Sequence, residues 1–402
     1  MKQSFRRLAL ATAIACCISG EAVAQAPAPS GNLAQLKAAL QGDLNAYLRD
    51  RSTSEHLSAL SLTVSLGRDQ PPIDLTAGTT KFHGGTRTKS TDLYQIGSNT
   101  KAFTAVAILQ LEAQGRLSID APIGDYLPEY ASFRKLTLRR LLNMTSGLES
   151  YDNTPSWERS YAARPSANVS ADTLIRLVYP KLKFQAGAKY YYSNTGYLLA
   201  QRIVDARSAS KSFDKELARI FASTGLKNTF YTSNMYPPSV AHRVVAGYYG
   251  NNDNGFEKFT GKDMTGYSLS WAQGAGAIVS TPQDLATWAR ALYQGTALLP
   301  EKQKRELMSL ISIKTAKPLA QPTADDPAGF GLGVAERFDP QLGAFWFYQG
   351  ETLGFRAAHL YFPKSDLVVC VFANSRPTEP NSKLQELFKT IDASIKAAGY
   401  HA

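Results

Sequence analysis

The segment Tyr94-Gln-Ile-Gly-Ser-Asn-Thr-Lys-Ala-Phe-Thr-Ala-Val-Ala-Ile-Leu-Gln-Leu111 places a serine and a lysine at the start of a predicted helix. A strand-like run at 93–96 ends in a glycine, and residues 102–111 are apolar on nearly every side of a helix. A helix that is apolar all round is a buried one. Ser98 and Lys101 are three residues apart and therefore share one face of this helix. Because burying an unpaired lysine is unfavourable, the spacing needs a structural or a chemical reason.

Two interpretations of this pair stay open on the residues alone. In the first, the Ser98 hydroxyl caps the helix and Lys101 extends along the surface to reach solvent. In the second, Ser98 is a nucleophile and Lys101 its base, because desolvation lowers a lysine pKa from ~10.4 toward neutrality. The helix N-terminus would then supply amides and a positive dipole end near a developing oxyanion.

A second candidate site is Tyr192-Ser-Asn194, in a tyrosine-rich segment just before another predicted helix. Such a segment is often packing, and Asn194 could cap the helix. Alternatively, a lysine ammonium next to Tyr192 favours the phenolate, which can accept the serine proton. Asn194 would then hold Lys101 or a substrate amide through hydrogen bonds.

Ser98-x-x-Lys101 followed by Tyr192-x-Asn194 resembles the serine β-lactamase and penicillin-binding-protein superfamily. The resemblance is to the branch with class C β-lactamases, DD-carboxypeptidases, D-aminopeptidases and family VIII-type esterases. It extends over roughly residues 57 to 375 and includes the segments 94–105, 117–123, 141–148, 192–197 and 274–285.

This resemblance implies an α/β (α+β) fold of the β-lactamase/transpeptidase type, with an antiparallel sheet flanked by helices plus an all-helical region. By family roles, Ser98 forms the acyl-enzyme, Lys101 and Tyr192 move protons, and Asn194 positions the substrate. Class A enzymes deacylate through a Glu-x-x-Asn element, which is absent from this sequence. Tyr192 with Lys101 is therefore expected to activate the deacylating water.

The third motif departs from the family pattern. Relatives carry Lys-Thr-Gly or His-x-Gly on the strand that borders the site, and this chain has Tyr348-Gln-Gly350. We expect Gly350 to let a substrate lie against the strand and the amide of Glu351 to be the oxyanion donor beside that of Ser98. Without the usual cation the site would favour uncharged esters or amides over β-lactams, unless Arg356 replaces it.

Residues 1–26 read as a secretory signal peptide, with a basic start, an apolar run at 8–20 and small-residue cleavage sites. Lipid anchoring at Cys16 or Cys17 is the alternative, but the residues before Cys16 match such a site poorly. Residues 27–402 are then one β-lactamase-related serine hydrolase domain. Its α/β part is expected at about 33–115 and 330–400 and its helical part at about 116–329, because strands near both ends enclose a helical middle.

The composition of the chain limits the classes of partner and ligand that we expect. The chain has 402 residues, 44% hydrophobic and 19% charged, which is typical of a globular enzyme. Its net charge of +11 suits an anionic cell envelope, but no basic run with interleaved aromatics predicts nucleic-acid binding. No run after the signal reaches the ~18 apolar residues of a membrane helix. No spacing of His or Cys predicts a metal site, and no cofactor is expected.

The leading hypothesis is an exported serine hydrolase, periplasmic or secreted, that cleaves esters or D-amino-acid peptide and amide bonds through an acyl-enzyme on Ser98. Three alternatives remain: a β-lactamase or DD-carboxypeptidase, a penicillin-binding or sensor protein that acylates without turnover, and an acyltransferase. A Ser-His-Asp hydrolase is disfavoured because the sequence has no Gly-x-Ser-x-Gly elbow. The partner is a small-molecule or peptide acyl substrate, and the oligomeric state stays open.

Overall fold

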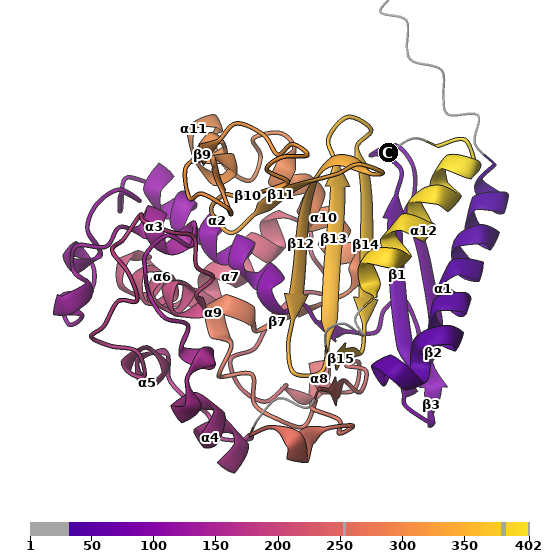
Figure 1. Cartoon of the computed structure of the whole chain (residues 1–402), viewed down its shortest axis with the longest axis horizontal. Helices are drawn as coiled ribbons and strands as arrows, with labels where there is room; N and C mark the ends of the chain where they lie inside the picture. Colours follow the sequence, from indigo (N-terminus) through magenta and orange to yellow (C-terminus); the bar gives the residue numbers. More distant parts are fainter. Residues whose placement is uncertain (1–31, 252–254, 379–382, 401–402) are drawn as a thin grey trace, which may run out of the picture.

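An antiparallel ten-stranded sheet is the centre of the molecule in the computed structural model, which describes residues 32–251, 255–378 and 383–400 (Figure 1). The strands lie in the order β3-β2-β1-β14-β13-β12-β11-β10-β8-β9. Their bounds are β1 (Ala59–Ser65), β2 (Ile73–Lys81), β3 (Gly84–Arg87), β8 (Leu310–Ser312), β9 (Pro318–Leu319), β10 (Ala328–Phe330), β11 (Ala335–Asp339), β12 (Gly343–Glu351), β13 (Arg356–Phe362) and β14 (Leu367–Ala373). The predicted signal peptide and its two cysteines lie outside the described residues.

The sheet joins the two ends of the chain, because β1 pairs with β14 from Leu60↔Ala373 to Ser65↔Val368. Every residue of β1, β13 and β14 is buried. Strands with both faces covered read as continuous apolar runs instead of alternating ones, as the Val-rich sequence of β14 does. Side chains of β14 alternate between two cores, with Val369 and Val371 in one and Cys370 and Phe372 in the other.

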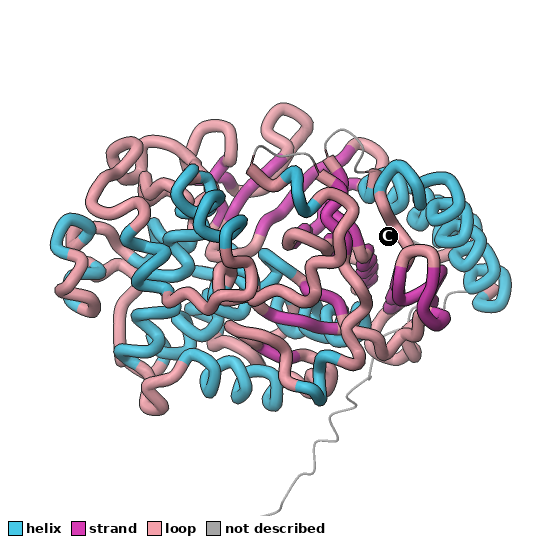
Figure 2. The backbone as a smooth tube through the Cα atoms, turned by 90° about the horizontal axis from the view of Figure 1, so that it is seen from below, coloured by secondary structure: helices cyan, strands magenta, loops and turns pink. Residues whose placement is uncertain are grey.

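Helices α1 (Leu33–Glu55) and α12 (Leu384–Ala397) lie side by side against one face of the sheet (Figure 1). Leucines at helical spacing, 36, 40 and 44, bury the inner side of α1. On the opposite face, α10 (Pro282–Tyr293) packs on the central strands, and α2 (Thr100–Ala113) connects the sheet to the helical region. Seen from below, most of that region gathers beyond the strands, away from α1 and α12 (Figure 2).

The helical region is built around α2, which is buried at nearly every position, as its sequence predicts. Its other helices are α3 (Leu138–Leu142), α4 (Pro155–Ala163), α5 (Ala171–Arg176), α6 (Asn194–Arg207), α7 (Phe213–Ser223), α8 (Pro238–Ala241), α9 (Gln273–Gly276) and α11 (Glu301–Met308). Two small sheets complete the fold: β4 (Tyr94–Gln95) with β7 (Ile278–Ser280) and β5 (Phe230–Tyr231), and β6 (Tyr248–Gly250) with β15 (Ser375–Pro377).

The predicted fold class is confirmed, and one boundary differs from the expectation. Strands β8, β9 and most of β10 lie inside the segment 116–329 that was expected to be helical, so the sheet begins again at Leu310. Each of these strands has only two or three residues. So short a run shows no periodicity, and these strands add to the sheet one after another: β10 pairs with β11, β8 with β10 and β9 with β8. No helix in the described part of the chain is long and apolar enough to cross a bilayer.

Candidate active site

The turn that carries Ser98 is a single 3₁₀ turn, Gly97–Asn99, between β4 and the start of α2. Gly97 has a φ of +49°, a left-handed conformation in which a side chain is strained. A Cβ there would also lie 2.5 Å from the backbone N and O of Glu351. Glycine therefore allows the turn to sit directly against β12, and Ser98 faces the cavity that borders the strand.

Gly350 is the matching feature on the strand side. A Cβ at this position would lie 1.9 Å from the Ile96 carbonyl oxygen and 2.6 Å from the Ser98 amide nitrogen. Gly350 does not line the cavity, unlike its neighbours Gln349 and Glu351. The absence of a side chain at Gly350 therefore lets the nucleophile's turn pack directly on β12, and the expected contact of Gly350 with a substrate stays a prediction.

Lys101 is fully buried and close to Ser98. Its Nζ donates to Ser98 Oγ at 2.9 Å and to the carbonyl oxygen of Ala275, in α9, at 2.8 Å. Burial lowers the pKa of Lys101 to about 7, and the negative charge of Asp152 opposes that change. Its burial is incompatible with a side chain that extends into solvent, and the Ser98 hydroxyl accepts from this lysine. A lysine that is substantially neutral near pH 7 can act as a general base.

Tyr192 lies over the lysine, with Lys101 Nζ 4.8 Å from the centre of its ring. Its hydroxyl is 3.4 Å from that of Tyr348. Burial raises the pKa of Tyr192, and a hydrogen bond with Ser98 lowers it by less. The phenolate expected from the sequence is therefore disfavoured at rest. At rest Tyr192 is therefore a neutral hydroxyl, which can donate a proton as well as accept one.

The segment around Tyr192 is held by the loop at 147–153. The Ser193 hydroxyl donates to the Glu149 carbonyl at 3.1 Å, and the amide of Asn194 donates to Ser150 Oγ at 2.9 Å. The neighbouring Tyr191 hydroxyl donates to the Glu149 carboxylate. These bonds fix the backbone on both sides of Tyr192, so its ring is placed by a connected polar network.

Asn194 begins α6 and its side chain does not cap that helix. Its Nδ2 donates to Asp152 Oδ2 at 2.7 Å, whereas its Oδ1 is buried and has no hydrogen-bond partner among the described residues. Asn194 also lines the cavity, so Oδ1 is available to accept from a substrate amide. Sequence reasoning missed Asp152, which follows no motif spacing and comes near Lys101 only through the fold.

The edge of β12 supports the predicted role of the Glu351 amide. Pairing between β11 and β12 ends at Glu336↔Trp346, so none of the described strands pairs with residues 347–351 on that side. The amide of Thr352 donates to the Phe355 carbonyl at 3.0 Å, toward β13. Because successive amides of a strand point to opposite edges, the Glu351 N–H points away from β13, toward the side of Ser98.

Ser98 opens into a cavity of about 760 Å³. One wall is aromatic and consists of Tyr151, Trp157, Tyr249, Phe256 and Trp271. The other wall contains Tyr190, Ile313, Phe330, Phe347 and Tyr348. Among the described residues, no group of three or more His, Cys, Asp and Glu side chains is placed to hold a metal ion. The size suits a small acyl substrate.

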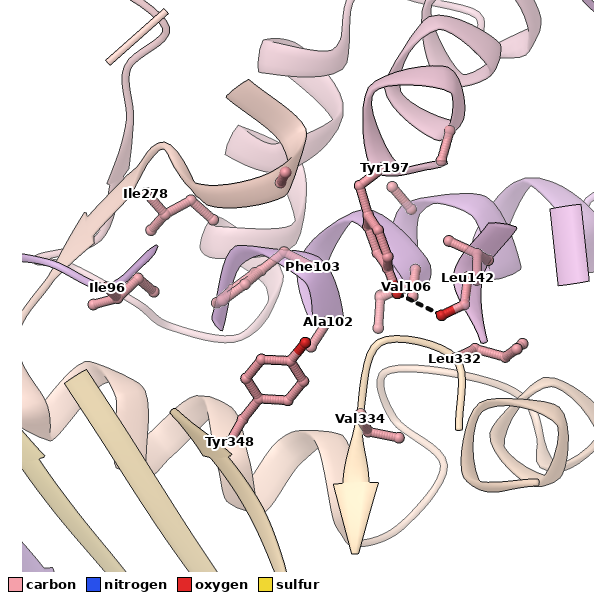
Figure 3. Close-up of a cluster of buried hydrophobic side chains, with 14 of the residues drawn as sticks. Ile96, Ala102, Phe103, Val106, Leu142, Tyr197, Ile278, Leu332, Val334 and Tyr348 are labelled. Carbon is pink, nitrogen blue, oxygen red and sulfur yellow. Dashed lines mark hydrogen bonds between the residues drawn. The ribbon is translucent and has the colours of Figure 1, made fainter. Parts of the chain in front are cut away.

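Tyr348 projects from β12 toward the first turns of α2, where Tyr197 of α6 also lies and donates to the Leu142 carbonyl (Figure 3). Tyr348 is buried, lines the cavity and faces Tyr192 as described above. The expectation that Arg356 replaces the missing cation is wrong. Arg356 is fully buried away from the cavity, and its Nη2 pairs with Glu55 Oε2 at 2.6 Å. Sequence distance from the glycine motif did not reveal which side of β13 this arginine occupies.

The arginines that line the cavity are Arg337 and Arg376. Arg376 pairs with the Glu351 carboxylate at 3.5 Å. Arg337 lies over the Phe347 ring, 4.6 Å from its centre, and its buried Nε has no hydrogen-bond partner in the part of the chain that the structure describes. Burial lowers its pKa, although a guanidinium stays charged in proteins. A cation is thus present on the wall that contains Tyr348.

The chain is similar in sequence to a known protein family and to several curated proteins. The family model described as Beta-lactamase matches residues 44–390. A penicillin-binding protein of Bacillus subtilis is 26% identical over 274 residues, which is 66% of this chain and 57% of the relative. A putative D-alanyl-D-alanine carboxypeptidase of Salmonella typhimurium is 22% identical, over 63% of this chain and 62% of the relative. The chain therefore spans about three fifths of the length of these curated relatives.

Solved structures are similar over nearly their whole length. A D-stereospecific amidohydrolase from a Streptomyces species has a TM-score of 0.73 and 24% identity, covering 90% of this chain and 99% of that one. The D-amino acid amidase of Ochrobactrum anthropi SV3, in complex with D-phenylalanine, has a TM-score of 0.74 and 23% identity, with the same coverage. These likenesses establish a shared fold.

Proposed function

Because the chain belongs to the beta-lactamase family, we propose that it is an exported serine hydrolase that cleaves esters or D-amino-acid peptide and amide bonds through an acyl-enzyme on Ser98. The observation that carries this proposal is the 2.9 Å hydrogen bond from a fully buried Lys101 to Ser98, at the wall of a cavity. A purely structural lysine would have its charge compensated, and no carboxylate forms an ion pair with this one among the described residues.

The reaction follows from the positions of the donors and acceptors. Neutral Lys101 accepts the Ser98 proton as Oγ attacks the substrate carbonyl carbon, and the amides of Ser98 and Glu351 stabilise the oxyanion. The proton then passes through the Tyr192 hydroxyl to the leaving oxygen or nitrogen as its bond to the carbonyl carbon breaks. A water molecule activated by the same two side chains hydrolyses the acyl-enzyme and restores the serine hydroxyl.

The aromatic wall supports an apolar or aromatic acyl group. The ring centre of Trp157 lies 5.4 Å from that of Phe256 and 5.6 Å from that of Trp271. Aromatic surfaces of this kind bury an apolar substituent with favourable ring contacts. The D-phenylalanine bound by the Ochrobactrum amidase is an example of such a group on the same fold.

Arg337 favours a second candidate function, cleavage of D-peptides or β-lactams that bear a carboxylate. A charged hydrogen bond contributes ~1.5–3 kcal/mol, against ~0.5–1.5 for the neutral phenol of Tyr348. Arg337→Gln should therefore weaken turnover of a chromogenic cephalosporin by about tenfold and leave a neutral nitrophenyl ester within threefold. Arg376→Gln is the matched control, because that arginine is paired with Glu351. Equal losses on both substrates would remove the case for the carboxylate.

The central test is covalent labelling of Ser98. A fluorophosphonate should give a single adduct on the peptide containing Ser98, and Ser98→Ala should give none. Steady release of acid from a chromogenic ester separates a hydrolase from a protein that acylates once and stalls. Product diverted to an added alcohol or amine would instead indicate an acyltransferase. Full labelling of Ser98→Ala would disprove the assignment.

A further inference from the structure

A buried polar network lies behind the nucleophile and is not used by the chemistry described above. His359 of β13 is 2% exposed, and its Nδ1 is 3.0 Å from Asn99 Oδ1. Its Nε2 is 3.2 Å from the hydroxyl of Tyr293, the last residue of α10. Tyr293 is in turn fixed by stacking on Trp346, with ring centres 5.0 Å apart. Asn99 is the residue directly after Ser98.

The donors and acceptors of this network have one consistent assignment. Asn99 Nδ2 donates to two carbonyl oxygens, of Ile96 and Ala357, each at 2.9 Å. Its Oδ1 must therefore accept, which requires a hydrogen on His359 Nδ1. The other ring nitrogen then accepts from the Tyr293 hydroxyl. Burial lowers the pKa of His359 to about 3, so the ring is neutral in this arrangement at ordinary pH.

This network connects the nucleophile's turn to the strands of the oxyanion site. Ile96 precedes the turn, whereas Ala357 lies on β13 directly opposite Gly350 of β12. One oxyanion donor, the Ser98 amide, is on the turn, and the other, the Glu351 amide, follows Gly350. The separation of the two donors therefore depends on how the turn is seated against β12 and β13. Asn99 is the side chain that bridges these parts, and His359 fixes its amide.

We propose that His359 is a positioning residue for this reaction: through Asn99 it seats the Gly97–Asn99 turn on β13 and thereby sets the spacing of the two oxyanion donors. The inference rests on the proposed acyl-enzyme function. Donors that are preorganised act mainly in the transition state, and a displacement of 1 Å can reduce the rate by ~10²-fold. Loss of this support should therefore lower kcat and leave KM nearly unchanged.

Two substitutions at one position separate positioning from packing. His359→Phe retains a ring and removes both hydrogen bonds, so kcat for a nitrophenyl ester should fall by about 10²-fold with KM within threefold. His359→Asn is smaller but places an amide N–H near the position of Nδ1, so it should recover at least tenfold of that loss although it packs less well. Affinity for a boronic acid that mimics the tetrahedral state should follow kcat in both variants.

Each outcome bears on the proposal. Wild-type kcat in a folded His359→Phe protein, or equal losses in the Phe and Asn variants, would overturn it. If the Phe variant does not fold, Asn99→Ala removes the same contact from the other end and must show the same selective loss of kcat. Ser98→Ala, assayed in parallel, keeps the two claims apart. Activity retained in Ser98→Ala contradicts the proposed function, whereas an inactive Ser98→Ala with an active His359→Phe contradicts only the positioning role.

Discussion

Arg356 and Lys101 are both fully buried, on opposite sides of the sheet region, and they differ in whether a carboxylate compensates the charge. Arg356 pairs with Glu55 at 2.6 Å and also donates through Nε to the Ser375 carbonyl at 2.8 Å. Lys101 donates to a hydroxyl and a carbonyl oxygen and lies over the rings of Tyr192 and Tyr197, but no carboxylate in the described part of the chain forms an ion pair with it, and burial lowers its pKa to about 7. A compensated charge stabilises a junction between elements, whereas an uncompensated one is held ready to lose its proton.

Removing Lys101 should have the largest effect on activity. Lys101→Met fills similar space without the charge, so kcat/KM should fall by more than the ~10²–10⁴-fold typical of one general base, because the lysine also orders Ser98. Stability should be unchanged or higher, since an uncompensated buried charge is removed. Ester hydrolysis and thermal unfolding measure the two effects. A strongly destabilised variant would place Lys101 in the same class as Arg356.

Tyr192→Phe should come next, with a loss of about 10²–10⁴-fold in kcat for one proton-transfer group. The ring stays over Lys101, so folding should be retained. Tyr190→Phe is the matched control on the same segment, because Tyr190 lines the cavity and its ring packs at a tilt against Phe330, 5.6 Å between ring centres. Equal losses in both variants, measured as single-turnover acylation, would show that the effect comes from packing.

Arg356→Met is the converse experiment on the compensated cation. The buried Glu55 keeps its pair with Arg51 and its hydrogen bond from Tyr47 but loses its fully buried partner, so the free energy of unfolding should fall by up to about 3–5 kcal/mol. Activity per folded molecule should remain within a few-fold of wild type, because Arg356 does not line the cavity. Urea unfolding gives the first quantity and active-site titration the second. The double variant Arg356→Met with Glu55→Gln should recover part of the stability, and its failure to do so would argue against the pair as the cause.

The same contrast explains what could be predicted from the sequence. Ser98 and Lys101 are one helical turn apart, and a buried helix forces them together, so local spacing was sufficient. The short strands β8 to β10 had no periodicity to detect. The fold brings Asp152, Arg337 and His359 to their partners, so no spacing in the sequence predicted their roles. Arg356 was misjudged because its distance from the glycine motif carries no information about Glu55, which is 301 residues away in the sequence.

The smallest expected effect comes from Asp152. Its negative charge acts on Lys101 from a distance, whereas Glu55 pairs directly with Arg356. Lys101 must be neutral to accept a proton, so kcat/KM should rise with pH and level off above about 7. Asp152→Asn keeps the shape and the contact to Asn194 but removes the charge that raises the lysine pKa. The inflection should therefore move to lower pH.

Protonation of Lys101 also makes the free energy of unfolding depend on pH, in a direction that follows from its pKa. The pKa of Lys101 is lower in the folded state than the ~10.4 of an unfolded chain, so between about 7 and 10 the unfolded state binds more protons and wild-type stability rises with pH. Lys101→Met lacks this contribution, so its advantage over wild type should be greatest below pH 7 and shrink toward pH 10. The free energy of unfolding of both proteins should be measured across that range. If the difference between them does not change with pH, and the Asp152→Asn inflection moves to higher pH, another group controls the reaction.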